Sequence, residues 1–380
     1  MGRFDKRRAH ICAWLRERFP RQPYIYFGLS GATLLHEALK STWRGSVVLP
    51  AFICPSISAM AAGARKGLIH VEADQSTLLP DPRRLDQCVA DQDPSDTVVL
   101  IDHSFGYPFT GVADLRRNNR NLLIIEDCAR SLGVTIGNRH PGEHSDWVLL
   151  SMYKTVLGSR NGAILLSKEP LPLRDGRRVR AGLRERAAGN RALRSAYDLW
   201  RRRHPLTGRD SAGLQSPGWI PQYGLPGDLC MRRFEDEILH FEKRASSDSV
   251  IAGELRDSLE QMDGIEPVRS MAGGRPADHF VSFRIVDAER RRHIVRALHR
   301  QGLFLSITWD LVPAHYACYA GTFPGGSTVS RDLAGQILHI PVRSFQDKGK
   351  RSRLIRLLRD LASAPAFSLQ RQSAMTESRA

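Results

Sequence analysis

The chain has 380 residues, enough for two domains with hydrophobic cores, and carries a formal net charge of +16 at pH 7. Its six cysteines are scattered without any Cys-x-x-Cys spacing, so the sequence predicts neither a metal site nor a disulfide framework. No segment approaches the roughly 18 to 20 apolar residues of a transmembrane helix, and the N-terminus has no apolar signal core. We therefore expect a cytoplasmic protein without membrane insertion.

The first half of the chain predicts a mainly parallel sheet. A short basic amphipathic helix at residues 7–18 lies in an N-terminal arm, residues 1–23. Short apolar segments then alternate with helical segments over residues 24–227, which favours parallel strands with helices on both faces of the sheet. We assign these residues to a large domain. Its predicted strands are residues 46–50, 68–72, 97–101, 122–125, 147–150 and 163–166.

The second half predicts a smaller C-terminal α/β domain, residues 228–365. Proline and glycine are frequent at residues 215–227, which is typical of a linker. One long helix is expected from about residue 228 to residue 262, and residues 366–380 are expected to be a disordered tail. The remaining predicted elements are a strand at 280–285, a helix at 290–301, a strand at 336–341 and a helix at 350–361.

A glycine-rich turn at residues 28–31 opens an amphipathic helix near the start of the large domain. Ser30 is a plausible N-cap of this helix, and Thr33 lies in its first turn. Free backbone N–H groups at a helix N-terminus attract a phosphate. The turn is therefore a candidate phosphate site, although many helices begin with Ser-Gly for capping alone.

Acidic residues follow two of the predicted strands. Asp102 follows the strand at 97–101, and Asp127 follows the strand at 122–125. The ends of such strands open onto the crevice where α/β proteins bind ligands. Asp127 and Asp102 are both candidate ligand-binding carboxylates. His103 is also placed to face a ligand, but a histidine at a strand end is more often a structural hydrogen-bonding residue.

Lys154 lies near the end of an almost wholly apolar segment, residues 147–158, whereas the other seven lysines lie in polar surroundings or at element ends. Loss of hydration disfavours the charged ammonium, and a neutral amine can form a Schiff base with an aldehyde cofactor. The alternative is a lysine whose stem only covers apolar surface. A lysine, a carboxylate for a pyridine nitrogen and a phosphate turn are what a pyridoxal phosphate site needs.

These segments, in this order, resemble the DegT/DnrJ/StrS family of sugar aminotransferases, which are fold-type I pyridoxal phosphate enzymes. The resemblance runs from about residue 24 to residue 361 and marks a divergent member. It implies a large domain with a mainly parallel, seven-stranded sheet flanked by helices, and a smaller C-terminal α/β domain. Further motifs that carry it lie at residues 48–55, 103–108, 126–133, 151–154 and 337–341.

The resemblance implies roles by position. Lys154 matches the Schiff-base lysine and Asp127 matches the partner of the pyridine nitrogen, so these two are the expected catalytic residues. Arg130 replaces a glutamine or histidine near the cofactor's phenolic oxygen, and Cys54 replaces an aromatic residue that stacks on the ring. Ala32 replaces a threonine. The expected cofactor contacts beside the catalytic pair are Ser30, Gly31, Ala32, Thr33, Cys54, His103, Arg130 and Ser151.

An arginine-rich segment, residues 174–227, departs most from the family. The family's histidine-glycine and Asn-x-Arg-Met motifs, which reach across a dimer, have no clean match, and Tyr223 and Arg232 are the nearest polar candidates. Clustered arginine suggests an anionic partner, and a nucleotide-linked sugar would bring a pyrophosphate that arginine suits. A solvated helical face is the simpler interpretation, and no nucleic-acid-binding module is recognised, so nucleic acid is not expected.

The resemblance implies an aminotransferase with pyridoxal 5'-phosphate as cofactor. It would transfer an amino group from glutamate or glutamine to a keto sugar, expected to be nucleotide-linked, in polysaccharide or secondary-metabolite biosynthesis. The expected assembly is a homodimer. Two alternatives stay open: a pyridoxal phosphate enzyme acting on a cyclitol, amino acid or lipid-linked sugar, and a catalytically idle relative acting as a regulatory or binding protein. The presence of Lys154 and Asp127 argues against the idle relative.

Overall fold

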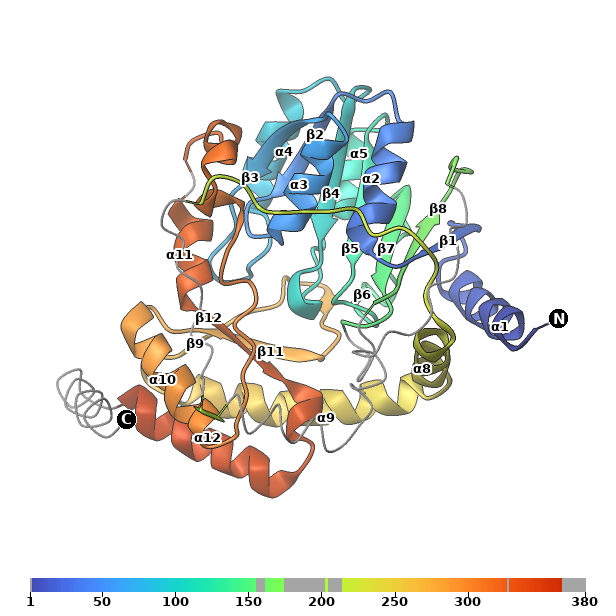
Figure 1. The fold of residues 1–380 in the computed structure, drawn as a ribbon. Helices are drawn as coiled ribbons and strands as arrows, with labels where there is room; N and C mark the ends of the chain where they lie inside the picture. Colours follow the sequence, from blue (N-terminus) through green and yellow to red (C-terminus); the bar gives the residue numbers. More distant parts are fainter. Residues whose placement is uncertain (1, 155–160, 174–201, 204–213, 327, 364–380) are drawn as a thin grey trace.

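The computed structural model describes residues 2–154, 161–173, 202–203, 214–326 and 328–363 (Figure 1). Its centre is a seven-stranded sheet of order β1-β8-β7-β5-β4-β2-β3. Strands β3, β2, β4, β5 and β7 run parallel, whereas β8 is antiparallel to both β7 and β1. The predicted fold class is confirmed. The strands are β1 (Tyr24–Gly28), β2 (Ser46–Pro50), β3 (Gly67–Val71), β4 (Thr97–Asp102), β5 (Leu123–Cys128), β7 (Trp147–Ser151) and β8 (Ala163–Ser167).

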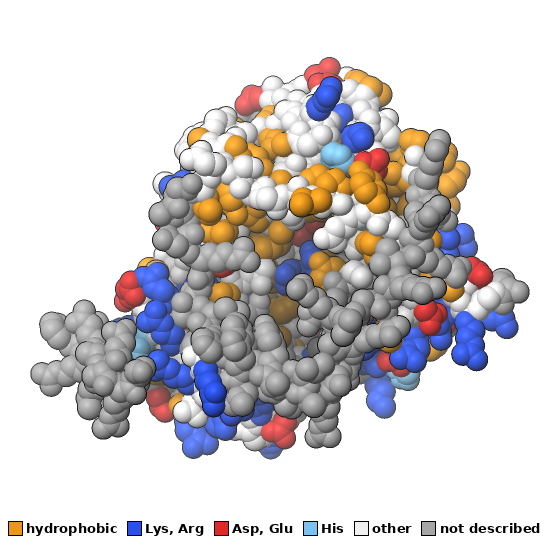
Figure 2. All heavy atoms as spheres, viewed as in Figure 1, with side chains coloured by type: hydrophobic (Ala, Val, Ile, Leu, Met, Phe, Trp, Pro, Cys, Tyr) orange, Lys and Arg blue, Asp and Glu red, His pale blue; other side chains and the backbone are white. Residues whose placement is uncertain are grey.

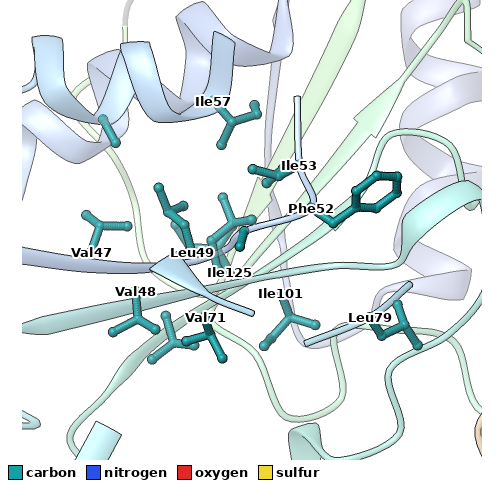
Figure 3. Packing of buried hydrophobic residues seen from close by; sticks show 14 of the residues in the cluster. Val47, Val48, Leu49, Phe52, Ile53, Ile57, Val71, Leu79, Ile101 and Ile125 are labelled. Atoms are coloured by element: carbon teal, nitrogen blue, oxygen red, sulfur yellow. The ribbon is translucent and has the colours of Figure 1, made fainter. Parts of the chain in front are cut away.

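The core of this sheet explains why its strands are almost continuously apolar. Strands β4, β7 and β8 are buried along their whole length, as expected where helices cover both faces of a parallel sheet. Figure 3 shows aliphatic side chains of β2, β4 and β5 packed together with Ile57 of the helix above them. The connecting helices are α2 (Gly31–Ser41), α3 (Pro55–Gly63), α4 (Pro82–Ala90) and α5 (Val112–Asn118).

The predicted strand positions agree with the observed ones to within a few residues, but the long helix predicted after residue 228 is wrong. Two helices form there, α8 (Asp228–Leu239) and α9 (Phe241–Glu260). The backbone leaves the helical region at His240, where φ is −112° and ψ is 17°. Helix α8 packs against the N-terminal helix α1 (Arg3–Arg18), and Arg7 forms ion pairs with Asp228 and Glu235.

The C-terminal part of the chain builds a second, smaller sheet with its own hydrophobic cluster. Strands β9 (Glu266–Pro267), β11 (Phe280–Arg284) and β12 (Ile337–Pro341) are antiparallel. Helices α9, α10 (Ala288–Arg300) and α12 (Lys348–Ser363) contribute to the cluster, and α11 (Thr328–Gln336) precedes β12. These elements match the predicted strand–helix–strand–helix order. The domain boundaries themselves stay a prediction.

Residues 214–227 form an extended segment that crosses helices α2 and α3 (Figure 1). Its attachment is specific: the Gln222 N–H donates to Thr33 Oγ1 at 2.8 Å, and the rings of Trp219 and His36 lie 5.0 Å apart. The predicted linker is therefore packed on the large sheet's helices. Most of the arginine-rich segment and all of the predicted tail, residues 366–380, lie outside the described residues. Within the described part of the chain, no helix is long and apolar enough to cross a membrane.

Candidate active site

A pocket lies at the carboxyl edge of the central strands, between the large sheet and the C-terminal part of the chain. It is lined by the N-terminus of α2, the N-terminus of α3, the ends of β4, β5 and β7, and residues that follow β5 and β7. Trp309 closes it from the C-terminal side. The pocket brings together most of the residues predicted from the sequence: Ser30, Gly31, Ala32, Cys54, Asp102, Asp127, Arg130, Ser151 and Lys154.

The N-terminus of α2 offers the pocket backbone donors that no side chain caps. Ser30 is the N-cap in extended conformation, yet its side chain makes no capping hydrogen bond. The first-turn N–H groups are therefore available to an anion, as expected at such a terminus. Gly31 permits close packing here, because a Cβ at this position would lie 3.1 Å from Leu149 of β7. Thr33 is buried away from the pocket and accepts the hydrogen bond from Gln222.

Two buried carboxylates lie side by side at the ends of β4 and β5. Asp102 and Asp127 are direct partners in the parallel register, so their side chains project to the same face of the sheet. Asp102 accepts a hydrogen bond from the Ser104 hydroxyl at 2.7 Å, and Asp127 accepts one from the Ala129 N–H at 2.9 Å. Burial, and then the charge of Asp127, raise the pKa of Asp102 to about 7.

The pKa of Asp127 is also raised, but a positive charge is among the causes that oppose the rise. Burial raises the pKa of Asp127, while Lys154 and the hydrogen bond from Ala129 oppose the rise. Two neighbouring carboxylates in a desolvated pocket resist double ionisation. Lys154 is the largest opposing cause at Asp127 but a lesser one at Asp102, so Asp127 is the member of the pair that ionises first.

His103 is placed differently from the cofactor contact expected of it. It is fully buried, outside the pocket lining, with its Nε2 2.9 Å from Glu126 Oε2 and its Nδ1 accepting the Phe109 N–H at 3.0 Å. Burial raises the pKa of Glu126, but His103 and the further hydrogen bonds to this carboxylate together outweigh burial and leave that pKa below its ordinary value. The backbone N–H of His103 also donates to the backbone carbonyl of Asp127 at 3.1 Å, so His103 fixes the strand end that carries Asp127.

Lys154 lies in the turn that follows β7. Ser151 organises this turn, because its Oγ accepts hydrogen bonds from the N–H groups of Tyr153 at 3.3 Å and Lys154 at 3.2 Å. Lys154 is half-buried, not fully buried as a position at the end of an apolar strand predicts, since Met152 and Tyr153 separate it from the strand end. It is the only lysine among the described residues that line the pocket.

Arg130 enters the pocket beside Trp309. No sequence motif marks Trp309 as a site residue. The Arg130 guanidinium lies over three rings, 5.0 Å from the centroid of Phe105, 5.7 Å from Phe280 and 5.9 Å from Trp309. Burial lowers the pKa of Arg130, although an arginine remains charged at neutral pH. Phe280 and Trp309 come from the C-terminal part and have no motif around them, so only the folded chain reveals this cage.

Of the remaining predicted residues, one lines the pocket and two lie outside it. Cys54 lines the pocket as the residue before α3, with its Sγ 3.1 Å from Ser56 Oγ. Tyr223 is exposed and donates its hydroxyl to Glu37, and Arg232 lines a separate cavity. Neither of the two residues considered for cross-dimer contacts therefore lines the pocket of its own chain.

The sheet order, the antiparallel β8 and the pocket at the carboxyl edge define a fold-type I transferase architecture. Residues 28–171, which include every predicted site residue, match the model of the "DegT/DnrJ/EryC1/StrS aminotransferase family". This match confirms, over those residues, the resemblance inferred from the motifs.

Solved structures with the same fold extend the likeness over nearly the whole chain. A DegT DnrJ EryC1 StrS aminotransferase from Brucella abortus has a TM-score of 0.70 at 17% identity, covering 96% of this chain and 91% of that one. The putative sugar aminotransferase Spr1654 from Streptococcus pneumoniae, in its PLP form, has a TM-score of 0.66 at 14% identity, covering 93% and 91%. 3-Amino-5-hydroxybenzoic acid synthase has a TM-score of 0.65 at 16% identity, covering 93% and 91%. The named PLP form agrees with the cofactor class expected for the family.

Proposed function

We propose that this chain is a pyridoxal phosphate-dependent aminotransferase that transfers an amino group from an amino acid to a keto sugar. One observation carries the proposal. The fold brings Lys154, Asp127 and the uncapped N-terminus of α2 into one pocket at the carboxyl edge of the sheet. Those three features are an amine, a carboxylate and a set of anion-binding backbone donors, which together suit that cofactor.

The residues present fit pyridoxal phosphate in their chemistry. The first-turn N–H groups of α2 would hold the phosphate, and the Ser151 hydroxyl, which uses its oxygen to accept two backbone N–H groups, keeps its own hydrogen to donate. Asp127 would hold the protonated pyridine nitrogen by a charge-assisted hydrogen bond. Trp309 and Ile53 supply apolar walls for a flat ring, in place of an aromatic residue at Cys54.

When bound, the cofactor supplies an aldehyde carbon that carries the amino group and a ring that accepts electrons. Lys154 Nζ would hold that aldehyde carbon in the resting enzyme. Once free, Lys154 Nζ would move a proton from the donor's α-carbon to the cofactor, and in the second half-reaction from the cofactor to the acceptor carbon. Asp127 keeps its negative charge at the ring nitrogen throughout, and His103 holds the backbone of Asp127 in place.

The keto-sugar acceptor is supported by the family and by the printed function of the pneumococcal neighbour, a putative sugar aminotransferase. A nucleotide-linked sugar, with glutamate or glutamine as donor, remains our proposal, as does a role in polysaccharide or secondary-metabolite biosynthesis. A non-sugar acceptor is the second candidate, because a neighbour of nearly equal likeness is 3-amino-5-hydroxybenzoic acid synthase. A catalytically idle relative is less well supported, since the described pocket keeps both Lys154 and Asp127.

We also propose a homodimer. Trp43, Ile220 and Tyr223 are 73%, 80% and 61% exposed, and the last two lie on the extended segment over α2 and α3. In the view of Figure 2, apolar side chains gather on the upper part of the molecule. Exposed apolar clusters of this kind mark interaction surfaces.

The two-domain division at residues 227 and 228 and a cytoplasmic location also remain our predictions; the six free cysteines suit a reducing compartment.

Half-reaction spectroscopy tests the proposed function. Purified protein loaded with pyridoxal phosphate should lose its visible absorbance when glutamate is added, as the cofactor takes up the amino group. A nucleotide-linked keto sugar should then restore the absorbance, and a keto-cyclitol should not. Restoration by the cyclitol alone would favour the second candidate, and no response to any amino acid would contradict aminotransferase activity.

A further inference from the structure

Arg130 is a half-buried cation, and no described residue forms a direct ion pair with its guanidinium. Its Nε is buried and makes no hydrogen bond, and within the described part of the chain no carboxylate forms an ion pair with it. The two nearby acids act on Arg130 through their charge but form no hydrogen bond with it: Asp102 accepts from Ser104, and Asp127 accepts from Ala129. Removing a charge from water without a partner is costly, so such a group is expected to receive an anion.

The aromatic cage holds this cation in place without neutralising it. Phe105, Phe280 and Trp309 surround the guanidinium at centroid distances of 5.0 to 5.9 Å. Each such contact stabilises a cation modestly and leaves its N–H donors unused. Arg130 also lines the pocket that contains Lys154. The cage therefore presents an oriented set of donors to whatever enters the pocket.

We propose that Arg130 is the receptor for the carboxylate of the amino-acid donor, a role that rests on the proposed function. A guanidinium offers paired, coplanar donors that match the two oxygens of a carboxylate, whereas a single phenolic oxygen uses only one of them. The phosphate has a separate place at the N-terminus of α2, on another element. Arg130 thereby selects donors that carry a carboxylate next to the reacting amine.

Equilibrium binding of glutarate, an unreactive dicarboxylate, tests this role without relying on turnover. We compare wild type with Arg130→Gln, which loses the charge, and with Arg130→Lys, which keeps the charge but loses the paired, coplanar N–H donors. Arg117→Gln is the matched control, because Arg117 is an exposed arginine on α5. Isothermal titration should show glutarate affinity falling about tenfold or more in Arg130→Gln, less in Arg130→Lys and not at all in the control. Pentane-1,5-diol, the uncharged analogue, should not discriminate among them.

Two results would overturn the inference. Unchanged glutarate affinity in Arg130→Gln with a shifted absorbance pH profile of the bound cofactor would assign Arg130 to the phenolic oxygen. No change in either would leave Arg130 as a structural cation. Should Arg130→Gln not fold, Arg130→Lys carries the same comparison. Failure of the proposed function would look different. Wild-type protein would then show no cofactor absorbance, yet its glutarate binding would still depend on Arg130. That result would contradict the proposed function but would support Arg130 as a carboxylate receptor.

Discussion

Replacing Asp102 by asparagine should stabilise the cofactor-free protein at high pH and leave it unchanged at low pH. Burial and the neighbouring Asp127 raise the pKa of Asp102 from 3.8 to about 7, a rise of about 3. Because the folded state binds this proton more tightly than the unfolded chain does, stability falls as the pH rises from about 4 to about 7. At about 1.4 kcal/mol for each pKa unit, the loss approaches 4 kcal/mol as an order of magnitude.

Asparagine removes that loss, since it has the same shape and no charge, and its amide oxygen can still accept the Ser104 hydroxyl hydrogen bond. Denaturant unfolding from pH 4.5 to 8.5 measures the difference between the two proteins. The variant should be several kcal/mol more stable at pH 8 and nearly equal to wild type at the acid end. Asp257→Asn, which removes an exposed carboxylate of α9, is the control and should show no such trend. Parallel pH profiles for Asp102→Asn and wild type would refute a carboxyl pair that shares one proton.

The remaining predictions concern the cofactor contacts. Asp127→Asn should fold but lose most amino transfer, because an amide does not keep the pyridine nitrogen protonated; near-normal turnover would point to Asp102 as the working acid. Gly31→Ala should weaken cofactor binding several-fold in fluorescence titrations, because a Cβ lies 3.1 Å from Leu149 and shifts the turn that holds the phosphate. Gly253→Ala in α9, where a Cβ meets nothing within 4 Å, is the control and should leave cofactor affinity unchanged while stabilising the fold by about 0.5 to 1 kcal/mol.

Local patterns in the sequence predict the strands and the chemistry of the site well. Apolar segments bounded by turn residues locate most strands of the large sheet, and parallel strands place their carboxyl ends at one edge. That geometry alone brings Asp127, at the end of β5, and Lys154, after β7, to the same pocket. No glycine or proline marks the helix break at His240, so the sequence predicts one long helix.

Features that depend on strand order or on distant contacts could not be predicted. The pairing of Asp102 with Asp127 follows from the neighbouring positions of β4 and β5, which the sequence leaves open among several strand orders. The aromatic cage of Arg130 joins residues more than a hundred positions apart, Phe105 and Trp309. His103 was assigned to the ligand because it follows a strand, but its buried contact with Glu126 turns it away from the pocket.

The most direct test of the account is the site of cofactor attachment. Protein reconstituted with pyridoxal phosphate should be yellow, and borohydride should fix the cofactor to one peptide, the one that contains Lys154, as peptide mass mapping can show. Lys154→Ala should abolish the labelling while leaving the fold intact, because the lysine is half-buried at the rim of a turn. Labelling at a different lysine, or no visible absorbance after reconstitution, would contradict the central claim.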